Sequence, residues 1–183
     1  MIHDVTHELQ TPEPVTLKNG LRAHLRLLRA DDVERLKAFF SRLSPESIFY
    51  RVLEFRKALT DEEARHLCDV DGQRRVAIAA VLEKDGEEHI IGVGRYNIVK
   101  PTEPDTAEAA VVIEDTYQGQ GLGRLLTTRV TQYARNHGIR RFVATIHLNN
   151  AKILQFIKNS GLRVRKNVDG NVWEMSIYLD PPQ

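Results

Sequence analysis

Residues 111–126 have the sequence VVIEDTYQGQGLGRLL, and the rest of the chain is best interpreted from this stretch. It begins with β-branched residues, continues through a polar turn that contains Gly119, Gly121 and Gly123, and ends in an apolar-periodic segment. This order predicts a strand, a loop and a helix. Glycine permits close approach of the backbone to a ligand, and the first turn of a helix offers unsatisfied N–H groups and a positive dipole end. The stretch therefore predicts an anion-binding loop, with pyrophosphate as the favoured ligand.

Two common nucleotide-binding motifs do not fit this loop. A Walker A loop ends in Gly-Lys-Ser/Thr, whereas Gly123 is followed by Arg124. A dinucleotide fingerprint needs GxGxxG and an acidic residue about 20 positions later, and residues 145–148 contain no acid. The pattern that fits is QxxGxG, filled by Gln118, Gly121 and Gly123, which resembles the coenzyme A pyrophosphate loop of the GNAT-superfamily N-acetyltransferases. The resemblance implies that the ligand is an acyl-CoA.

Two further segments extend the resemblance over roughly residues 21–179. Residues 150–162, NAKILQFIKNSGL, are similar to the later NxxAxxLYxKxGF element of the superfamily. The matching residues are Asn150, Phe156, Gly161 and Leu162. Residues 43–51, LSPESIFYR, look like the amino-terminal half of the bacterial protein lysine acetyltransferases called Pat.

The order of the predicted elements agrees with this family. Alternation predicts a strand over residues 20–29, and Lys84-Asp85-Gly86 predicts a hairpin between residues 75–82 and 89–99. Later segments alternate between strand and helix: strand 106–113, a helix to about His137 ended by Gly138, strand 142–146, helix 150–159 and a hairpin turning at Asp169-Gly170. We therefore expect an α/β protein with the GNAT fold, a mixed, mostly antiparallel central sheet flanked by helices. Residues 1–19 are expected to form an amino-terminal arm and residues 20–183 a single GNAT acetyltransferase domain.

Capping residues predict three helices in the amino-terminal half. Asp31 is the expected N-cap of the first, with Glu34 as its capping-box partner. Ser44, followed by Pro45, and Thr60 are the expected N-caps of the next two. In the resembled fold this region borders the substrate entrance. Five of its residues are therefore candidate contacts of the acceptor: Phe49, Tyr50, Arg51, Phe55 and Arg56. The alternative is that the aromatic residues belong to the core and that the arginines are solvated.

Composition limits the classes of partner. The 183 residues are 42% hydrophobic and 28% charged, which suits one globular domain. A net charge of +1 provides no long-range attraction for nucleic acid or an anionic membrane. The single cysteine, Cys68, is expected to be a small packed hydrophobe, and the absence of a long apolar run or a signal peptide predicts a cytoplasmic protein. The histidines and the cysteine show no ligand spacing, so we expect no metal. Nothing in the sequence indicates an oligomeric state.

The resemblance implies a set of residues that bind acetyl-CoA as co-substrate. The backbone of residues 111–113 is expected to pair with the pantetheine amides as an added strand would, and the loop to hold the pyrophosphate. Asn150 is expected to bridge the pantetheine arm or to cap its own helix. The full set of candidate CoA contacts is Val111, Val112, Ile113, Gln118, Gly119, Gln120, Gly121, Leu122, Gly123, Arg124, Asn150 and Phe156.

Acyl transfer to an amine needs a proton acceptor, because a lysine-type ammonium has a pKa of about 10.4 and only the neutral amine attacks. Glu108 is the one charged residue in an otherwise small and apolar strand, where a carboxylate is costly unless it is paired or used. In the resembled family a glutamate about ten residues before the QxxGxG glutamine acts as general base, which is the position of Glu108. The alternatives are a structural role for Glu108, with Glu114 at the end of the strand as the base; Glu114 is otherwise expected to be a solvated turn residue.

The remaining steps of the reaction are less well specified. A backbone N–H of residues 111–113 is expected to polarise the thioester carbonyl. Many GNAT enzymes place a tyrosine acid in the later motif, but this chain has Ile157 there, preceded by Phe156. Another group or water must therefore protonate the leaving thiolate.

Together these features predict an acyl-CoA-dependent N-acyltransferase that uses acetyl-CoA and direct attack in a ternary complex. A protein lysine is slightly favoured as acceptor because of the Pat-like segment. A small-molecule amine is the first alternative. An acyl-CoA-binding sensor or interaction module without turnover is the second.

Overall fold

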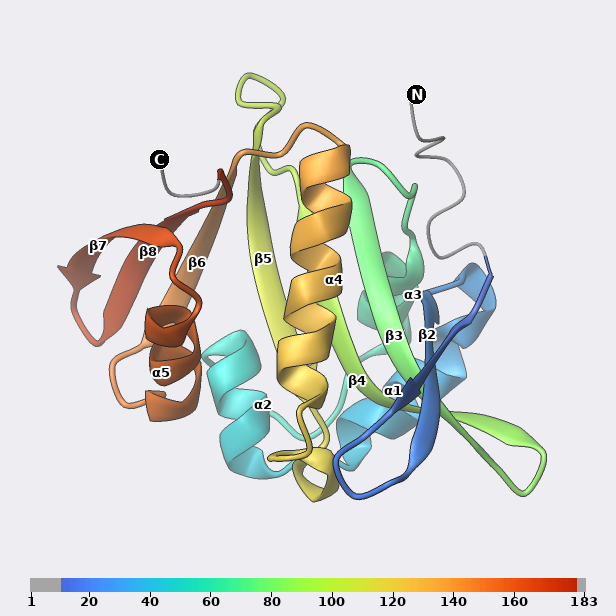
Figure 1. Cartoon of the computed structure of the whole chain (residues 1–183). Helices are drawn as coiled ribbons and strands as arrows, with labels where there is room; N and C mark the ends of the chain where they lie inside the picture. Colours follow the sequence, from blue (N-terminus) through green and yellow to red (C-terminus); the bar gives the residue numbers. More distant parts are fainter. Residues whose placement is uncertain (1–10, 181–183) are drawn as a thin grey trace.

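The computed structural model describes residues 11–180, so residues 1–10 of the predicted arm lie outside the described part. One eight-stranded open sheet, in the order β1-β2-β3-β4-β5-β6-β8-β7, forms the centre of the molecule (Figure 1). Its strands are β1 (Glu13–Thr16), β2 (Arg22–Leu27), β3 (Arg75–Lys84), β4 (Glu87–Asn97), β5 (Thr106–Ile113), β6 (Arg141–His147), β7 (Arg163–Asp169) and β8 (Val172–Tyr178). Within residues 11–180 only β5 and β6 pair in parallel, which confirms the predicted fold class.

Helices cover both faces of this sheet. They are α1 (Val33–Ser41), α2 (Pro45–Val52), α3 (Asp61–Cys68), α4 (Leu122–Asn136) and α5 (Ala151–Asn159), with 3-10 turns at η2 (Ala30–Asp32) and η3 (Asp115–Tyr117). The α4 helix packs on one face with the core around Leu126, and α1 and α3 pack on the other with the core around Phe39 (Figure 1). Each face therefore has its own hydrophobic core.

The capping predictions for α2 and α3 are confirmed. The hydroxyl of Ser44 accepts a hydrogen bond from the N–H of Ser47 at 3.1 Å, and Pro45 occupies the first helical position. Thr60 and Glu63 form a reciprocal capping box. These side chains satisfy N–H groups that the helices themselves leave free, so the start of each helix is set locally.

The prediction that Asp31 caps the first helix is wrong. The chain forms the η2 turn first, α1 begins at Val33, and Asp32 occupies the N-cap position without capping the helix through its side chain. The Asp32 carboxylate instead accepts hydrogen bonds from the Arg26 guanidinium and from the N–H of Arg29 at 2.8 Å. The contact with Arg26, a buried arginine on β2, determines where the Asp32 side chain lies and therefore where α1 begins. The local sequence gives no sign of this contact.

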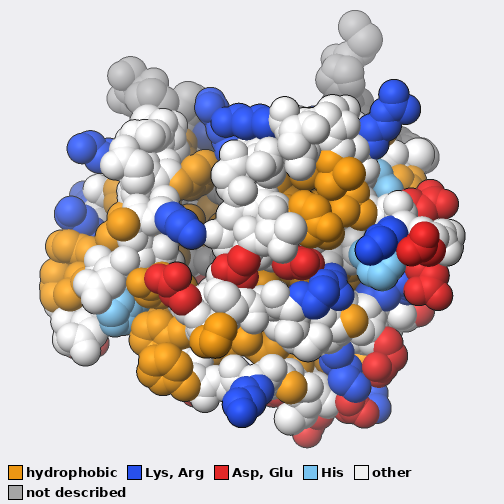
Figure 2. All heavy atoms as spheres, turned by 90° about the horizontal axis from the view of Figure 1, so that it is seen from below, with side chains coloured by type: hydrophobic (Ala, Val, Ile, Leu, Met, Phe, Trp, Pro, Cys, Tyr) orange, Lys and Arg blue, Asp and Glu red, His pale blue; other side chains and the backbone are white. Residues whose placement is uncertain are grey.

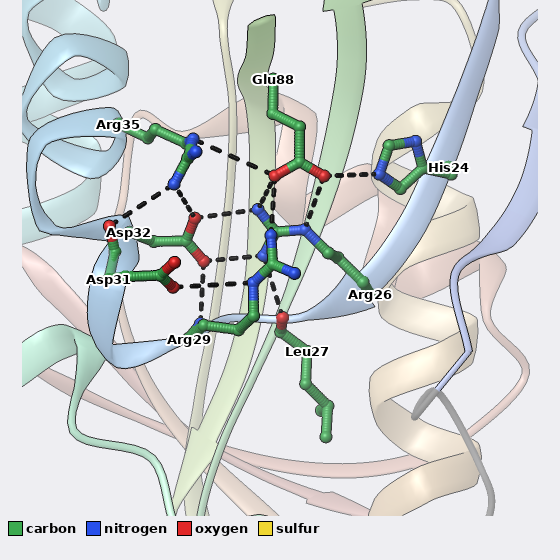
Figure 3. Close-up of polar contacts among 8 residues, drawn as sticks. All are labelled: His24, Arg26, Leu27, Arg29, Asp31, Asp32, Arg35 and Glu88. Carbon is green, nitrogen blue, oxygen red and sulfur yellow. Dashed lines mark hydrogen bonds and ion pairs between the residues drawn. The ribbon is translucent and has the colours of Figure 1, made fainter.

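Arg26 and Asp32 form a buried ion pair with two parallel hydrogen bonds of 2.7 and 2.8 Å (Figure 3). Both side chains are almost inaccessible, with exposures of 3% and 0%. Glu88, from β4, completes the group by accepting hydrogen bonds from Arg26 and Arg29 at 2.7 Å. The network joins β2, the start of α1 and β4, which are far apart in the sequence.

The pKa of Asp32 reflects this environment. Burial alone would raise it, but the hydrogen bonds and charge of Arg26, together with the N–H of Arg29, outweigh burial and hold the pKa below its ordinary value. The stability contributed by this shift is present above the ordinary carboxylate pKa. It is lost as the pH falls through the lowered value.

Two glycines of β4 let α4 lie close to the sheet. A Cβ atom at Gly92 would lie 2.8 Å from Cδ1 of Ile113 and 3.1 Å from Cδ1 of Leu126, and one at Gly94 would lie 2.9 Å from Cγ2 of Val130. Real Cβ contacts are longer than this, so larger residues would push α4 outward. The close packing fixes where the first turn of α4 meets the end of β5.

The second part of the predicted arm belongs to the sheet. Residues Glu13–Thr16 form the edge strand β1, which pairs antiparallel with β2 from Glu13 opposite Leu25 to Thr16 opposite Arg22. The turn that follows hydrogen-bonds to the glycine loop, from the N–H of Lys18 to the carbonyl of Gln120 at 3.2 Å. The first hairpin is therefore packed against the loop that dominates the sequence.

We expect Asp32→Asn to lower the free energy of unfolding by about 3 kcal/mol, because it removes one partner of a buried ion pair while Glu88 continues to compensate Arg26 in part. Urea denaturation measures the change. The matched control is Asp31→Asn, whose side chain is 73% exposed, and it should alter stability by less than about 0.5 kcal/mol. Equal losses in the two variants would contradict the role given to the buried pair.

Candidate functional site

The site is organised by the separation of β5 from β6. β5 pairs with β4 from Glu108, which is opposite Asn97, to the end of the strand at Ile113, which is opposite Gly92. It pairs with β6 only over Thr106–Glu108, and beyond that point the two strands diverge (Figure 1). The edge of residues 109–113 that faces β6 therefore has no strand partner within the described chain. Apart from the carbonyl of Ile113, which accepts a hydrogen bond from the Gln118 side chain, this edge can pair with an extended ligand in the manner of an added strand.

The glycine loop lies directly after this open edge. Gly119 and Gly121 have positive φ angles of 75° and 87°, and Gly121 occupies the N-cap position of α4. No side chain of the described residues caps α4, and its first turn contains no acidic residue. The N–H groups of the first turn and the positive end of the helix dipole are thus directed at the space beside the loop. The loop and the start of the helix therefore lie where the sequence predicts them, and anion binding at this position stays a prediction.

Gln118 connects the loop to its surroundings instead of standing free. Its side-chain amide donates hydrogen bonds to the carbonyl of Ile113 at 3.1 Å and to the hydroxyl of Ser47 on α2 at 3.2 Å. Its carbonyl oxygen accepts a hydrogen bond from Lys152 of α5 at 2.7 Å. Within residues 11–180, Gln118 therefore holds together the end of β5, the start of α2 and the start of α5.

Asp115 ties α2 to the same loop. Its carboxylate accepts hydrogen bonds from the N–H of Ser44 at 2.8 Å and from the hydroxyls of Ser44 and Ser47 at 2.7 and 2.8 Å. Burial tends to raise the pKa of Asp115, but these hydrogen bonds outweigh it and lower the pKa below the ordinary value. The carboxylate therefore stays ionised at neutral pH and holds the start of α2 against η3.

Lys18 is a site residue that sequence reasoning missed. Its side chain lies over the glycine loop, with Cε 3.6 Å from the position of a Cβ atom at Gly121. Its ammonium forms no ion pair within residues 11–180, in contrast to Lys37, which pairs with Asp61. No local pattern marks Lys18, because only the packing of the β1–β2 turn on the loop brings it there.

Glu108 lies where β5 and β6 part. The side chain is exposed on the sheet face that carries α1 and α3, and it borders an open hollow on β6, β8 and β7. The other residues of the hollow are Val143, Ala144, Thr145, Arg165, Lys166, Asn167, Glu174, Met175 and Ser176. No hydrogen bond or ion pair among residues 11–180 involves the Glu108 side chain, so it is available to a substrate.

Glu114, the alternative base, is differently placed. Its side chain is buried, with the residue 8% exposed, and its Oε2 accepts a hydrogen bond from Nε of Arg42 at 3.0 Å. The expectation that Glu114 is a solvated turn residue is wrong. The carboxylate is buried because Arg42 on the α1–α2 connection closes over the end of β5.

Two aromatic residues of the Pat-like segment, Phe49 and Tyr50, together with Phe55, form a group beside the end of β6. Phe49 stacks on Phe55 with a centroid distance of 4.6 Å and contacts His147, at the end of β6, edge-on at 5.2 Å. The hydroxyl of Tyr50 donates a hydrogen bond to the carbonyl of Asn149 at 3.2 Å. Phe55 is 85% exposed, so it is not a core residue. The group connects α2 with the segment that precedes α5.

Four more of the residues considered from the sequence have structural roles. Arg56 pairs with Glu63 at 2.5 Å, and Cys68 is buried, which raises the pKa of its thiol to about 11. Asn150 caps α5 by accepting a hydrogen bond from the N–H of Ile153 at 3.4 Å. Phe156 packs in the small core between α5 and β6 and β8. Contacts of Asn150 and Phe156 with a cofactor stay predictions.

The comparisons with known proteins agree with this geometry. The profile described as "Acetyltransferase (GNAT) family" matches residues 37–162. The chain belongs to the GNAT acetyltransferase family. "Acetyltransferase PA5475" of Pseudomonas aeruginosa is 35% identical over 126 residues, which cover 69% of this chain and 67% of that relative. "Acetyltransferase Pat" of Mycolicibacterium smegmatis is 25% identical over 162 residues, or 82% of this chain, but the match spans only 44% of Pat.

Solved GNAT structures resemble this one. The GNAT domain of S. lividans PAT superimposes with a TM-score of 0.82 and 27% identity, covering 91% of this chain and 96% of that domain. An N-acetyltransferase, PaiA of Thermoplasma acidophilum, was solved in complex with coenzyme A. It covers 84% of this chain and 97% of its own, with a TM-score of 0.66 and 18% identity, so it shares the fold.

Two negative findings apply to residues 11–180. They contain no group of three or more His, Cys, Asp or Glu side chains arranged to bind a metal ion. None of their helices has both the length and the apolar character needed to cross a membrane.

We expect Gly121→Asp to weaken acetyl-CoA binding by about 10- to 100-fold, because a carboxylate would occupy the seat expected for the pyrophosphate. Isothermal titration calorimetry measures the affinity. Gly138→Asp is the matched control, since Gly138 at the other end of α4 also has a positive φ, of 80°, and has open space around it. It imposes similar backbone strain and should leave the affinity unchanged. Unaltered affinity in a folded Gly121→Asp variant would contradict the loop assignment.

We expect Lys18→Gln to weaken acetyl-CoA binding by about 2- to 5-fold, the scale of one exposed ion pair, and to do so more at low salt than at high salt. The control is Lys84→Gln at the tip of the β3–β4 hairpin, which lies away from the loop (Figure 1). The same titration, run at two ionic strengths, tests both variants. A loss in Lys18→Gln that does not depend on salt would argue against a charge contact.

Proposed function

We propose that this protein transfers an acetyl group from acetyl-CoA to an amine, and that a lysine side chain of a protein is the acceptor. The observation that carries the proposal is the position of Glu108, at the point where β5 leaves β6. It lies between the open edge of β5, which leads to the glycine loop, and a hollow open to solvent. A donor and an acceptor can therefore meet at this carboxylate from opposite sides.

The donor is expected to lie along the open edge of β5. Its pyrophosphate would accept hydrogen bonds from the first turn of α4, with Lys18 adding a positive charge. The pantetheine arm would pair with the backbone of residues 109–113, as an extra strand does. This arrangement directs the thioester toward Glu108 and holds it by backbone groups that the fold has already ordered.

The chemistry then follows from the groups present. Glu108 accepts a proton from the acceptor ammonium, directly or through water, and the neutral nitrogen attacks the thioester carbonyl. A backbone N–H at residues 111–113 stabilises the negative charge that develops on the carbonyl oxygen. The new C–N bond forms as the C–S bond breaks, and the thiolate leaves readily because a thiol pKa is about 8.5. The nitrogen loses a second proton as the amide forms, and this proton reaches the thiolate through water. Ile157 is buried and apolar and supplies no proton.

Two features support a protein lysine as acceptor. The hollow beside Glu108 is open and is lined by side chains of both charges, with Glu174 on β8 and Arg165 and Lys166 on β7, which suits a side chain presented by a large partner. Figure 2, a view from the lower end of Figure 1, shows acidic, basic and hydrophobic side chains interspersed over the surface around the glycine loop. A closed pocket lined by acids would instead have favoured a small amine.

A non-catalytic sensor is less well supported. That function would predict a Glu108 side chain held by a structural partner away from the hollow. Glu108 has no such hydrogen bond or ion pair within residues 11–180, whereas Glu114 is held by Arg42. The free carboxylate thus favours turnover.

We expect Glu108→Gln to lower kcat by about 10² to 10⁴-fold, the usual effect of losing a general base, with acetyl-CoA affinity within a few-fold of the wild type. The measurement is steady-state acetylation of lysine peptides between pH 6 and pH 9. Part of the loss should be recovered as the pH rises, because more of the amine is then neutral.

Glu114→Gln is the control for this experiment. It should lower thermal stability through the loss of the Arg42 pair and should keep the acidic limb of the wild-type pH profile. Activity of Glu108→Gln within twofold of the wild type over this pH range would show that Glu108 is structural.

A further inference from the structure

Two arginines near Glu108 differ from the other sheltered arginines. Eight arginines are buried or half-buried among residues 11–180. Six of these have a carboxylate within 4.0 Å: Arg26, Arg35, Arg56, Arg75, Arg129 and Arg141. The other two, Arg51 and Arg95, have none within the described residues. The only hydrogen bond that either guanidinium makes there runs from Arg95 to the carbonyl of Leu67, at 3.4 Å.

The sheet register places Arg95 beside Glu108. Asn97 is opposite Glu108 and Arg95 is opposite Ala110, so Arg95 and Glu108 are diagonal neighbours on one face of the sheet. Such neighbours are about 7 to 8 Å apart at the backbone, within reach of long side chains. Arg51 comes from the last turn of α2, which packs against β5. Two guanidinium groups and one carboxylate therefore share this side of the site.

The electrostatics agree with this placement. Burial lowers the pKa of Arg51, and the negative charge of Glu108 partly offsets the lowering. Burial also lowers the pKa of Arg95, to about 10, and the positive charge of Arg51 adds to the effect. Two positive charges therefore lie close together in a partly buried environment. This arrangement is unfavourable unless an anion binds between them.

We propose that Arg51 and Arg95 form a subsite for a carboxylate of the substrate, next to the reacting amine at Glu108. Guanidinium groups suit this ligand because their planar N–H donors match the two oxygens of a carboxylate. A bound carboxylate would supply the negative charge that the other six arginines find in a neighbouring Asp or Glu side chain. The inference rests on the proposed function, because it places the reaction at Glu108.

The carboxylate can come from either substrate. It can belong to the acyl group, as in a dicarboxylic acyl-CoA, or to the acceptor, as an acidic residue beside the target lysine. Both sources present the same chemistry to the arginines, and matched pairs of compounds distinguish them.

The donor arm of the test compares succinyl-CoA with butyryl-CoA, which has the same number of acyl carbons and no terminal charge. Calorimetry on the wild-type protein gives the two dissociation constants without any acceptor. If the acyl group supplies the carboxylate, succinyl-CoA should bind about 10- to 100-fold more tightly than butyryl-CoA, the scale of a charged hydrogen-bonded contact. That preference should disappear in Arg51→Gln and in Arg95→Gln.

The acceptor arm compares lysine peptides flanked by aspartate with the same peptides flanked by asparagine. With acetyl-CoA as donor, kcat/KM should favour the aspartate peptides by a similar factor if the acceptor supplies the carboxylate. If no peptide is acetylated, calorimetry of the same peptides on the CoA-bound protein gives the comparison. The arginine variants should again lose the preference, so that aspartate and asparagine peptides give the same value in each variant.

Arg74→Gln is the control, because Arg74 is exposed and lies on the loop before β3. Thermal melting of every variant separates loss of the subsite from loss of the fold. Equal values for both members of both pairs in the wild type would overturn the subsite, as would variants that lose charged and neutral compounds alike. Failure of acetyl-CoA to bind, or of every amine to be acetylated, would instead count against the proposed function.

Discussion

The site depends on the point at which β5 stops forming hydrogen bonds with β6. A strand inside a sheet normally pairs along both edges, and unpaired backbone groups away from water are costly. β5 pairs with β6 over Thr106–Glu108 and then departs from it, while β4 continues to hold the other edge. The sheet is therefore rigid up to Glu108 and open beyond it. In the proposed complex the donor supplies the missing strand, so binding and the completion of the sheet are one event.

Close packing on the other side of β4 and β5 brings the anion-binding loop to the same opening. Gly92 and Gly94 leave room for Leu126 and Val130, so α4 lies close against β4. The first turn of α4 consequently begins where β5 ends. Two glycines on β4 thus help to set the position of the glycine loop, which follows much later in the chain.

Local features of the site could be predicted from the sequence, and contacts between distant segments could not. The glycine loop and the caps at Ser44 and Thr60 depend on residues within one or two turns, and they lie where expected. The first helix was predicted to begin after Asp31, but Asp32 is the residue that precedes α1, because its carboxylate pairs with Arg26 on β2. The positions of Lys18 and Arg95 follow from hairpin packing and strand register, for which one sequence gives no direct signal.

The hydrogen bonds of Gln118 have a thermodynamic consequence for the two substrates. This one amide joins α2 to the end of β5 and the start of α5. In the proposed complex, α2 borders the acceptor, and the other two segments border the donor. A ligand that shifts α2 would alter the geometry of the loop, and a ligand in the loop would alter α2. Such coupling is reciprocal, because the free energy by which one ligand favours the other is shared equally between them. A change in the hydrogen bonds of Gln118 would therefore alter the coupling seen from the donor side and from the acceptor side by the same amount.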